Sequence, residues 1–281
     1  MVNFPNCKIN IGLKVIRKRD DGFHDIETIF YPLPIYDALE IIKGPVTIPG
    51  SKSVSPSGIE FSVSGLPIKD DPGRNLCIRA FELIRKDFPA IPPLRIHLHK
   101  AIPIGGGLGG GSTDGVFTLM LLNEKLKLNI SRDKLLDYAL QLGSDCPFFI
   151  VNQPCVGTGR GEVLQPLSID LSTYSFVLVN PDIPIDTGWA FSNVSVNRSA
   201  KPLQQIITQP VESWKTDLKN DFEEIVVNHY RGLNEIKKTL YDHGALYASM
   251  TGSGSCFYGI FQKNSPTSVS FENNFDVKYV K

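Results

Sequence analysis

Apolar and polar residues alternate in several short segments, most of them in the first hundred residues. Alternation with a period of two places every second side chain on the same face of a β-strand. The pattern predicts strands over residues 8–15, 26–33, 38–42, 59–63, 94–100 and 176–180. Residues 44–57 are rich in Gly, Pro and Ser, which favours a long surface loop between two of these strands.

Other segments repeat their apolar residues at the spacing of a helix. They predict helices over residues 74–86, 112–126 and 132–142, with shorter helical patches up to residue 241. Two apolar runs, 245–250 and 256–261, enclose Thr251-Gly-Ser-Gly-Ser255 and predict a closing hairpin, in which the glycines need be no more than a turn. Strands that cluster early, with helices mixed in later, indicate the α+β class.

The composition is that of a globular protein without net charge. Of 281 residues, 42% are hydrophobic, so the chain can bury a substantial core in one large domain or two closely packed ones. Its 29 basic and 29 acidic residues cancel, which argues against nucleic acid or an anionic membrane as a partner. No segment approaches the roughly 20 apolar residues of a membrane span, and the amino terminus lacks an apolar signal core. We therefore expect a cytoplasmic protein.

The cysteines and histidines do not form a metal-binding pattern. The five cysteines are scattered, odd in number and mostly set in apolar sequence, which is typical of reduced thiols in a cytoplasmic core. His97 and His99 would share one face of a strand, but no third ligand accompanies them at a metal-like spacing. The sequence predicts no metal fixed by protein ligands alone.

Six glycines in seven positions, Gly105 to Gly111 interrupted only by Leu108, suggest a loop that holds a phosphate. Glycine lets backbone N–H groups approach a ligand closely, and a helix behind the loop adds its dipole. Ser112, Thr113 and Asp114 have the residue types of an N-cap and first helical turn. Apolar flanks on both sides argue against a flexible linker.

Two common nucleotide loops fit this segment poorly. Gly105-x-Gly107-x-x-Gly110 matches the dinucleotide fingerprint, but such a match is nearly automatic in a tract so rich in glycine, and no acidic residue ends a second strand about 20 positions later. A P-loop requires a lysine directly after the glycines, and none is present.

Three motifs in order resemble those of the GHMP family of small-molecule kinases. They are Lys8-Ile-Asn10, Pro103-Ile-Gly-Gly-Gly-Leu-Gly-Gly-Gly-Ser112 and Met250-Thr-Gly-Ser-Gly-Ser-Cys256. The resemblance implies a two-part α+β fold with the active site in the cleft between the parts. The first part, residues 1–155, would resemble domain 2 of ribosomal protein S5 and carry the phosphate loop. The second, residues 156–281, would be ferredoxin-like.

Four further segments resemble one branch of that family, whose members act on a CDP-linked methylerythritol. They are Arg19-Asp-Asp-Gly-Phe-His-Asp-Ile-Glu-Thr28, Asn75-Leu76, Leu142-Gly-Ser-Asp-Cys-Pro-Phe-Phe149 and Gly159-Arg-Gly-Glu-Val-Leu-Gln-Pro166. The resemblance implies that ATP phosphorylates a hydroxyl of the methylerythritol, a step of non-mevalonate isoprenoid synthesis. Alternatives are a GHMP kinase for homoserine or a mevalonate-type alcohol, and a relative that binds nucleotide without turnover.

Asp145 is the candidate catalytic carboxylate, with Lys8 as its partner. It lies between Ser144 and the apolar residues 147–150, so we expect it at the edge of a core, where a carboxylate needs a partner. Taken alone, it would more often be a helix cap or turn residue, by about two to one. The resemblance assigns the matching aspartate to the attacking hydroxyl, which it would either deprotonate or orient.

The resemblance also implies a cytosine site. Phe23 and His24 would stack on the base and bind its edge, and a second aromatic, either Phe191 or its rival Trp189, would cover the other face. Tyrosine is usual at position 23, so the stacking surface is kept while a hydroxyl is lost. Without the resemblance, the pair would be a turn followed by a half-buried histidine.

The remaining predicted contacts also come from the resemblance. The ATP-binding residues would be Pro103, Gly105, Gly106, Gly107, Leu108, Gly109, Gly110, Gly111, Ser112, Thr113 and Asn75. The further substrate contacts would be Asn10, Thr187, Thr251 and Gly252. Mg²⁺ would enter with ATP, with Ser112 as its candidate side chain, and the protein would be a monomer or weak homodimer. Ser112-Thr113-Asp114-Gly115 replaces a more alanine-rich helix start, and Gly115 costs about 1 kcal/mol of helix propensity.

Overall fold

A computed structural model describes residues 1–44, 54–55, 58–68, 72–196, 201–263, 265, 268–271 and 275–280. By its internal contacts the chain divides into two compact units. Unit 1 comprises Met1–Cys7, Pro34–Ile104 and Gly109–Asn152, and unit 2 comprises Lys8–Leu33, Gly105–Leu108 and Gln153–Lys281. The proposed domain boundary at residue 155 stays a prediction.

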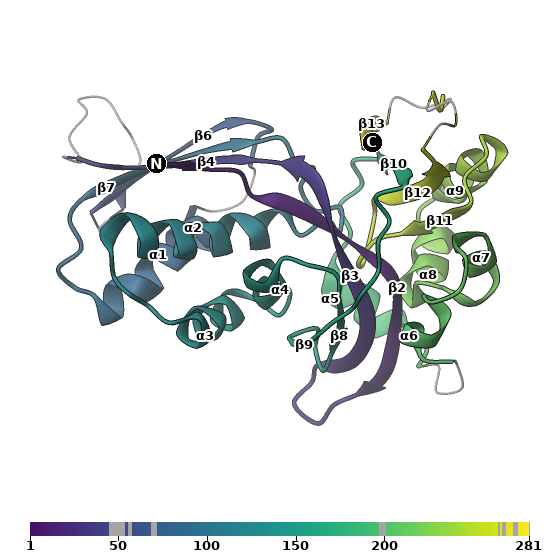
Figure 1. Cartoon of the computed structure of the whole chain (residues 1–281), viewed down its shortest axis with the longest axis horizontal. Helices are drawn as coiled ribbons and strands as arrows, with labels where there is room; N and C mark the ends of the chain where they lie inside the picture. Colours follow the sequence, from purple (N-terminus) through teal and green to yellow (C-terminus); the bar gives the residue numbers. More distant parts are fainter. Residues whose placement is uncertain are drawn as a thin grey trace. The chain divides into compact units, whose positions relative to one another are not determined.

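Unit 1 contains a five-stranded sheet covered by helices. The strand order is β1 (Val2–Asn3), β4 (Ala38–Lys43), β7 (Leu94–Lys100), β6 (Ile59–Gly65) and β5 (Val54–Ser55). The helices are η1 (Pro72–Arg74), α1 (Leu76–Asp87), α2 (Gly110–Leu126), α3 (Arg132–Leu142) and α4 (Cys146–Val151). Leu94, Ile96 and Leu98 are buried, whereas the alternate side chains of β7 are more exposed. The helices cover one face of this sheet (Figure 1).

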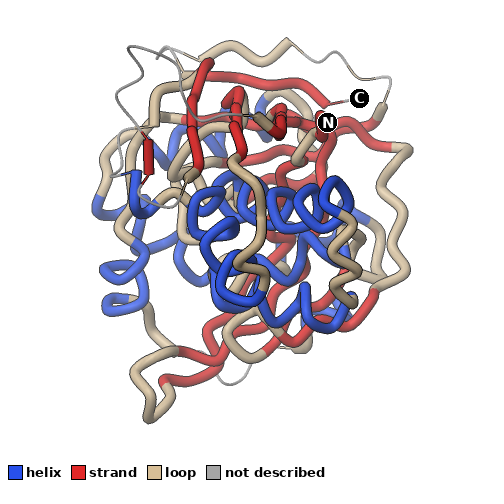
Figure 2. The backbone as a smooth tube through the Cα atoms, turned by 90° about the vertical axis from the view of Figure 1, so that its left-hand side faces the viewer, coloured by secondary structure: helices blue, strands red, loops and turns tan. Residues whose placement is uncertain are grey.

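Most of unit 2 is built on two four-stranded sheets. The first has the order β2 (Asn6–Lys18), β3 (His24–Tyr36), β8 (Cys155–Thr158) and β9 (Val163–Pro166). The second has the order β11 (Tyr247–Met250), β12 (Phe257–Gln262), β10 (Tyr174–Asn180) and β13 (Asp276–Val280), with antiparallel neighbours. The helices are α5 (Thr187–Asn193), α6 (Leu203–Ile206), η2 (Val211–Ser213), α7 (Trp214–Asp217), α8 (Asp221–His229) and α9 (Leu233–Asp242). Figure 2 colours these helices and strands along the backbone.

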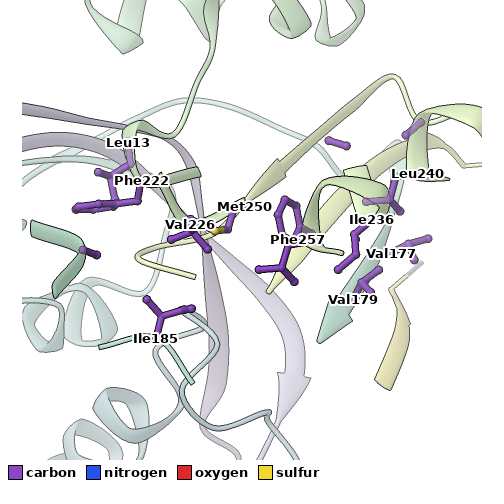
Figure 3. Close-up of a cluster of buried hydrophobic side chains, with 14 of the residues drawn as sticks. Leu13, Val177, Val179, Ile185, Phe222, Val226, Ile236, Leu240, Met250 and Phe257 are labelled. Carbon is purple, nitrogen blue, oxygen red and sulfur yellow. The ribbon is translucent and has the colours of Figure 1, made fainter. Parts of the chain in front are cut away.

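The core of unit 2 joins the second sheet to the helices α8 and α9. Val226 and Ile236 from the helices pack with Val179, Met250 and Phe257 from the strands, and all five are buried. Figure 3 shows these side chains together with Leu13 of β2. This core includes Leu13 of β2 and Met250 of β11, two strands that carry or directly precede several of the predicted site residues.

The predicted helices and strands are confirmed, with one correction at the start of α2. All six alternating segments are strands, and the predicted helix over residues 132–142 has those same bounds in the structure. The closing hairpin is present as β11 and β12, although the chain continues into β13. The prediction missed β8, β9 and β13, which are only four or five residues long. Most of the predicted surface loop, residues 45–53 and 56–57, lies outside the described residues.

Gly115 has a packing role that helix propensity does not reveal. A Cβ atom on Gly115 would lie 2.8 Å from Cβ of Leu76, which begins α1. The absence of a side chain therefore lets α1 and α2 approach closely, and α2 runs through this glycine without interruption. The close packing of two helices offsets the local cost of glycine.

Candidate active site

Lys8 is a buried cation at the centre of a polar cluster in unit 2. Its side chain is on β2, and the residue is 2% exposed. Its ammonium donates to Asn10 Oδ1 at 2.6 Å and to the carbonyl of Gly107 at 2.9 Å, and lies 5.5 Å from the ring centre of Phe30. A buried ammonium needs such acceptors. Lys8 thus joins the amino-terminal motif to the glycine loop.

Asn10 and Thr251 connect the same cluster to the late glycine motif. The backbone N–H of Asn10 donates to Thr251 Oγ1 at 2.9 Å. The Thr251 hydroxyl lies 3.3 Å from both the side-chain oxygen of Asn10 and the Gly107 carbonyl oxygen. Residues from all three predicted motifs therefore meet in unit 2, the glycine motif through Gly105–Leu108. Gly252 follows with φ 58°, and its carbonyl accepts a hydrogen bond from Asn220.

The first half of the glycine loop rests on the backbone of the late motif. Gly105 and Gly107 have φ of 75° and 78°, a region that favours glycine. A Cβ atom on Gly107 would collide with the Thr251 carbonyl, and one on Gly106 would collide with Cys256 Sγ. Gly105, by contrast, has open space beside it. The buried side of the loop is therefore filled by unit 2, and Lys8 N donates to the Leu108 carbonyl at 3.0 Å.

The second half of the loop opens α2, and the predicted cap was wrong. The N-cap is Gly109, with φ 71° and no side-chain capping bond, so Ser112, Thr113 and Asp114 are inside the helix. The glycine backbone can enter the helix from a left-handed conformation, which makes a side-chain cap unnecessary there. Gly111 is exposed, with no atom within 4 Å of its Cβ position, whereas Thr113 is fully buried.

A buried ion cluster lies behind the start of α2. Lys100 Nζ is 2.5 Å from Asp37 Oδ2 and 2.8 Å from Asp114 Oδ2. Asp37 Oδ1 also accepts the N–H groups of Ala101 and Ile102, whereas Asp114 Oδ1 has no hydrogen-bond partner. Burial, together with the neighbouring Asp37 carboxylate, raises the pKa of Asp114 well above its ordinary value. The cluster ties β4, the end of β7 and α2 together just before and after the loop.

Asp145 occupies the N-cap position of α4, in unit 1, but its side chain makes no capping hydrogen bond there. The residue is half-buried, as expected for the edge of a core. The thiol of the next residue, Cys146, interacts with the Ser112 hydroxyl. Burial raises the pKa of the Cys146 thiol to about 12. The starts of α2 and α4 are therefore neighbours, which places Ser112 near Asp145.

The predicted aromatic residues make three separate ring contacts. The Arg160 guanidinium lies 4.7 Å from the ring centre of the exposed Phe23. His24 stacks on Phe191, with 4.9 Å between the ring centres. Trp189 contacts His229, 4.6 Å away between ring centres, and is not among the ring contacts of His24. Burial, and secondarily Lys18, lowers the pKa of His24.

Other predicted residues have mainly local contacts. Asn75 caps α1, since its Oδ1 accepts the N–H of Cys77 at 2.9 Å. Thr187 begins α5, and its hydroxyl lies 3.0 Å from that of Ser253. Pro103 is buried at the entrance to the loop, and Leu108 is 1% exposed within it. Their predicted contacts with ATP or substrate stay predictions.

Several polar and charged side chains near the predicted residues carry no signal that was recognised in the sequence. Thr28, Lys100, Asp37 and Arg160 are supporting residues, and Thr28 and Arg160 lay within segments already singled out. The signal for the ion cluster would have been three charged residues in otherwise apolar sequence. All five cysteines are buried thiols, as predicted for core positions.

Within the described residues, no group of three His, Cys, Asp or Glu side chains could hold a metal ion. His97 and His99 contact Ser62 and Ser64 on the neighbouring strand. Among the described helices, none is long and apolar enough to cross a membrane.

Comparison with known proteins agrees with this arrangement. Models of the GHMP kinases N terminal domain and GHMP kinases C terminal match residues 75–153 and 199–273. Mevalonate kinase from Methanococcus jannaschii shares the fold, with a TM-score of 0.70 at 12% identity over 99% of this chain and 97% of that one. The chain belongs to the GHMP kinase family.

Within that family, several relatives that match nearly the whole chain share one name. A protein from Bacteroides fragilis, "4-diphosphocytidyl-2-C-methyl-D-erythritol kinase", is 44% identical over 98% of this chain and 97% of its own. The protein of that name from Azobacteroides pseudotrichonymphae is 46% identical over 94% of both chains. A crystal structure of 4-(cytidine 5'-diphospho)-2C-methyl-D-erythritol kinase has a TM-score of 0.76 at 28% identity, covering 92% of this chain and 90% of that one.

Proposed function

We propose that this kinase transfers the γ-phosphoryl group of ATP to a hydroxyl of 4-diphosphocytidyl-2-C-methyl-D-erythritol, giving the 2-phosphate in the non-mevalonate isoprenoid pathway. The relatives that support this proposal carry the name of that activity, and this chain matches them over nearly their whole length. The observation that carries the chemistry is the bond of Lys8 to both Asn10 and the Gly107 carbonyl. It links a candidate acceptor site to the phosphate loop.

The reaction needs positioning and charge neutralisation more than covalent chemistry. The acceptor oxygen forms a bond to the γ-phosphorus while the bond from that phosphorus to the bridging oxygen breaks. Asp145 would accept the hydroxyl proton or orient the hydroxyl, and Lys8 would hold that carboxylate and the incoming phosphoryl group.

The glycine loop would hold the ATP phosphates through backbone N–H groups. Gly105 and Gly111 have open space where a side chain would be, and Gly111 is in the first turn of the 17-residue helix α2. N–H groups and the helix dipole both favour an anion there. Mg²⁺ would supply further charge neutralisation, and the half-buried Ser112 is the side chain that would hold it.

Cytosine recognition would rest on Phe23, His24 and Phe191. Their rings are in contact with partners of the same unit, and Phe23 is 51% exposed, so it offers surface to a base. Thr187, Thr251 and Gly252 would contribute further contacts. We also propose a cytoplasmic monomer or weak homodimer.

The direct test is ADP release by purified protein with Mg²⁺-ATP, supplied separately with the cytidylyl substrate, homoserine and mevalonate. Turnover with the cytidylyl substrate alone supports the proposal. Turnover with another acceptor would keep the phosphate site but discard the cytosine site. A folded protein that binds ATP and turns over none of the three would instead be a non-catalytic relative.

Asp145→Asn tests the proposed carboxylate in the same assay. We expect kcat to fall by orders of magnitude, with KM for ATP little changed, because a transition-state contact is lost. Asp137→Asn, which alters an exposed carboxylate in α3, is the matched control and should leave kcat unchanged. An Asp145→Asn enzyme as fast as the control would disprove the role.

A further inference from the structure

Thr28 is a fully buried residue of β3 that contacts the neighbouring strand through its hydroxyl. Thr28 Oγ1 lies 2.7 Å from the carbonyl oxygen of Gly12 and 2.9 Å from Asn10 Nδ2. Asn10 is in turn bound to Lys8. The hydroxyl is therefore one residue removed from the proposed catalytic lysine.

The direction of each hydrogen bond in this chain is fixed by its two ends. A carbonyl oxygen only accepts, so the single hydroxyl proton of Thr28 is committed to Gly12. Toward Asn10, Thr28 Oγ1 can then only accept, so the amide NH₂ of Asn10 must face it. The Asn10 oxygen consequently faces the ammonium of Lys8, which only donates.

We propose that Thr28 is a positioning residue for phosphoryl transfer, which fixes the side-chain amide of Asn10 so that its oxygen faces Lys8. The inference rests on the proposed role of Lys8. A flipped amide would place an NH₂ group against the ammonium and lose a charge-assisted hydrogen bond. Thr28 holds this orientation before any substrate arrives.

The backbone of β2 contributes to the same device. Gly12 has φ 75°, a left-handed conformation within a strand, and its carbonyl receives the Thr28 proton. A Cβ atom there would lie 2.7 Å from a methyl carbon of Leu218, so a side chain is excluded. The Thr28 hydroxyl thereby becomes an acceptor for Asn10.

The test compares Thr28→Val with Thr28→Ser. Valine keeps the branched shape but removes the hydroxyl, leaving Asn10 Nδ2 and the Gly12 carbonyl without this partner. We expect Thr28→Val to lower kcat by about tenfold to a hundredfold, as for the loss of one charge-assisted bond in the transition state, with KM for ATP little changed. Thr28→Ser, which restores the hydroxyl, should stay within about threefold of wild type.

Thr118→Val is the matched control for stability. Thr118 is also fully buried, and its hydroxyl donates to the Asp114 carbonyl at 2.7 Å within α2. Thr118→Val should lower Tm about as much as Thr28→Val does, but it should leave kcat unchanged. If Thr28→Val is as active as Thr118→Val, the inference is wrong.

Coupling to Asn10 separates positioning from general destabilisation. Once Asn10→Ala has removed the amide, adding Thr28→Val should lower kcat little further, whereas two independent roles would multiply their effects. Multiplying effects would overturn the inference. Lys8→Ala separates a failure of the proposed function from a failure of the role of Thr28. An active Lys8→Ala enzyme refutes the proposed chemistry. An inactive Lys8→Ala enzyme, together with a fully active Thr28→Val enzyme, refutes only the role of Thr28.

Discussion

His24 stacks on Phe191, with 4.9 Å between ring centres and 19° between ring planes. Phe191 is held from another side by Phe222, whose buried ring meets it edge-on at 4.8 Å. The stack therefore has a rigid base in the core of unit 2. Phe191, rather than Trp189, is therefore the aromatic that contacts the Phe23-His24 pair, through the ring of His24.

Phe191→Ala should raise KM for the cytidylyl substrate with little change in KM for ATP. Loss of one stacking face costs about 1–3 kcal/mol of binding. Trp189→Ala is the matched control, since Trp189 contacts His229 and Tyr230 instead. Steady-state kinetics on both variants show which of the two aromatics stacks on cytosine. A large rise in KM for the cytidylyl substrate in Trp189→Ala alone would assign that role to Trp189.

His24 should titrate below its ordinary pKa of 6.5, because burial and the nearby Lys18 disfavour the charged ring. At pH values between the lowered pKa and 6.5, the unfolded chain binds more protons than the folded one. Stability from this group is therefore present above pH 6.5 and falls as the pH drops below it. An NMR titration, with the signal assigned through His24→Gln, measures the midpoint directly. A midpoint above 6.5 would contradict the prediction.

Periodic segments could be predicted from sequence because their signal is local. The strand over residues 94–100 alternates because one face is buried, and the helix over residues 132–142 has a capping serine, Ser131, directly before it. The resemblance likewise brought together Lys8, Gly107 and Thr251, residues far apart along the chain.

The rest depended on contacts that a local pattern does not carry. Ser112 looked like a cap, but the left-handed Gly109 takes that position. Gly115 looked like a defect, but it lets α1 approach α2. The direction of the Thr28 hydrogen bonds depends on the backbone of Gly12. Each case involves either glycine backbone freedom or a partner from another element.

Gly107→Ala should destabilise the protein and abolish activity. Its φ of 78° is strained for alanine, and the new Cβ would collide with the Thr251 carbonyl. A loss of about 2 kcal/mol or more in the free energy of unfolding is expected from strain and overpacking. Chemical denaturation measures this loss, and a wild-type midpoint would contradict the predicted contact.

Gly111→Ala should separate stability from ATP binding. No atom lies within 4 Å of its Cβ position, and alanine gains up to about 1 kcal/mol over glycine in a helix interior, so Tm should be unchanged or higher. KM for ATP should rise, because the methyl group would enter the space proposed for phosphate. An unchanged KM for ATP would mean that the phosphate does not approach this side of the loop.

Asp114→Asn should be tolerated at pH 7, whereas Asp37→Asn should lower the free energy of unfolding. Asp37 accepts two backbone N–H groups as well as Lys100, while Asp114 has one oxygen without a partner, so a neutral side chain disrupts fewer hydrogen bonds at position 114 than at position 37. The pKa of Asp114 is raised on folding from an ordinary 3.8, so the native state binds the extra proton and stability falls as the pH rises above 3.8. Asparagine mimics the protonated form and should remove that slope.

The two single variants and their combination make this prediction decisive. In Asp37→Asn, the Asp114 carboxyl remains to balance Lys100, so we expect a loss of only about 1–3 kcal/mol from the weakened backbone bonds. The double variant leaves the Lys100 ammonium without a carboxylate, which should cost about 3–5 kcal/mol or prevent folding. Denaturant unfolding between pH 5 and pH 8 measures all three. If Asp114→Asn proved as damaging as Asp37→Asn at every pH, the prediction that a neutral side chain is tolerated at position 114 would be wrong.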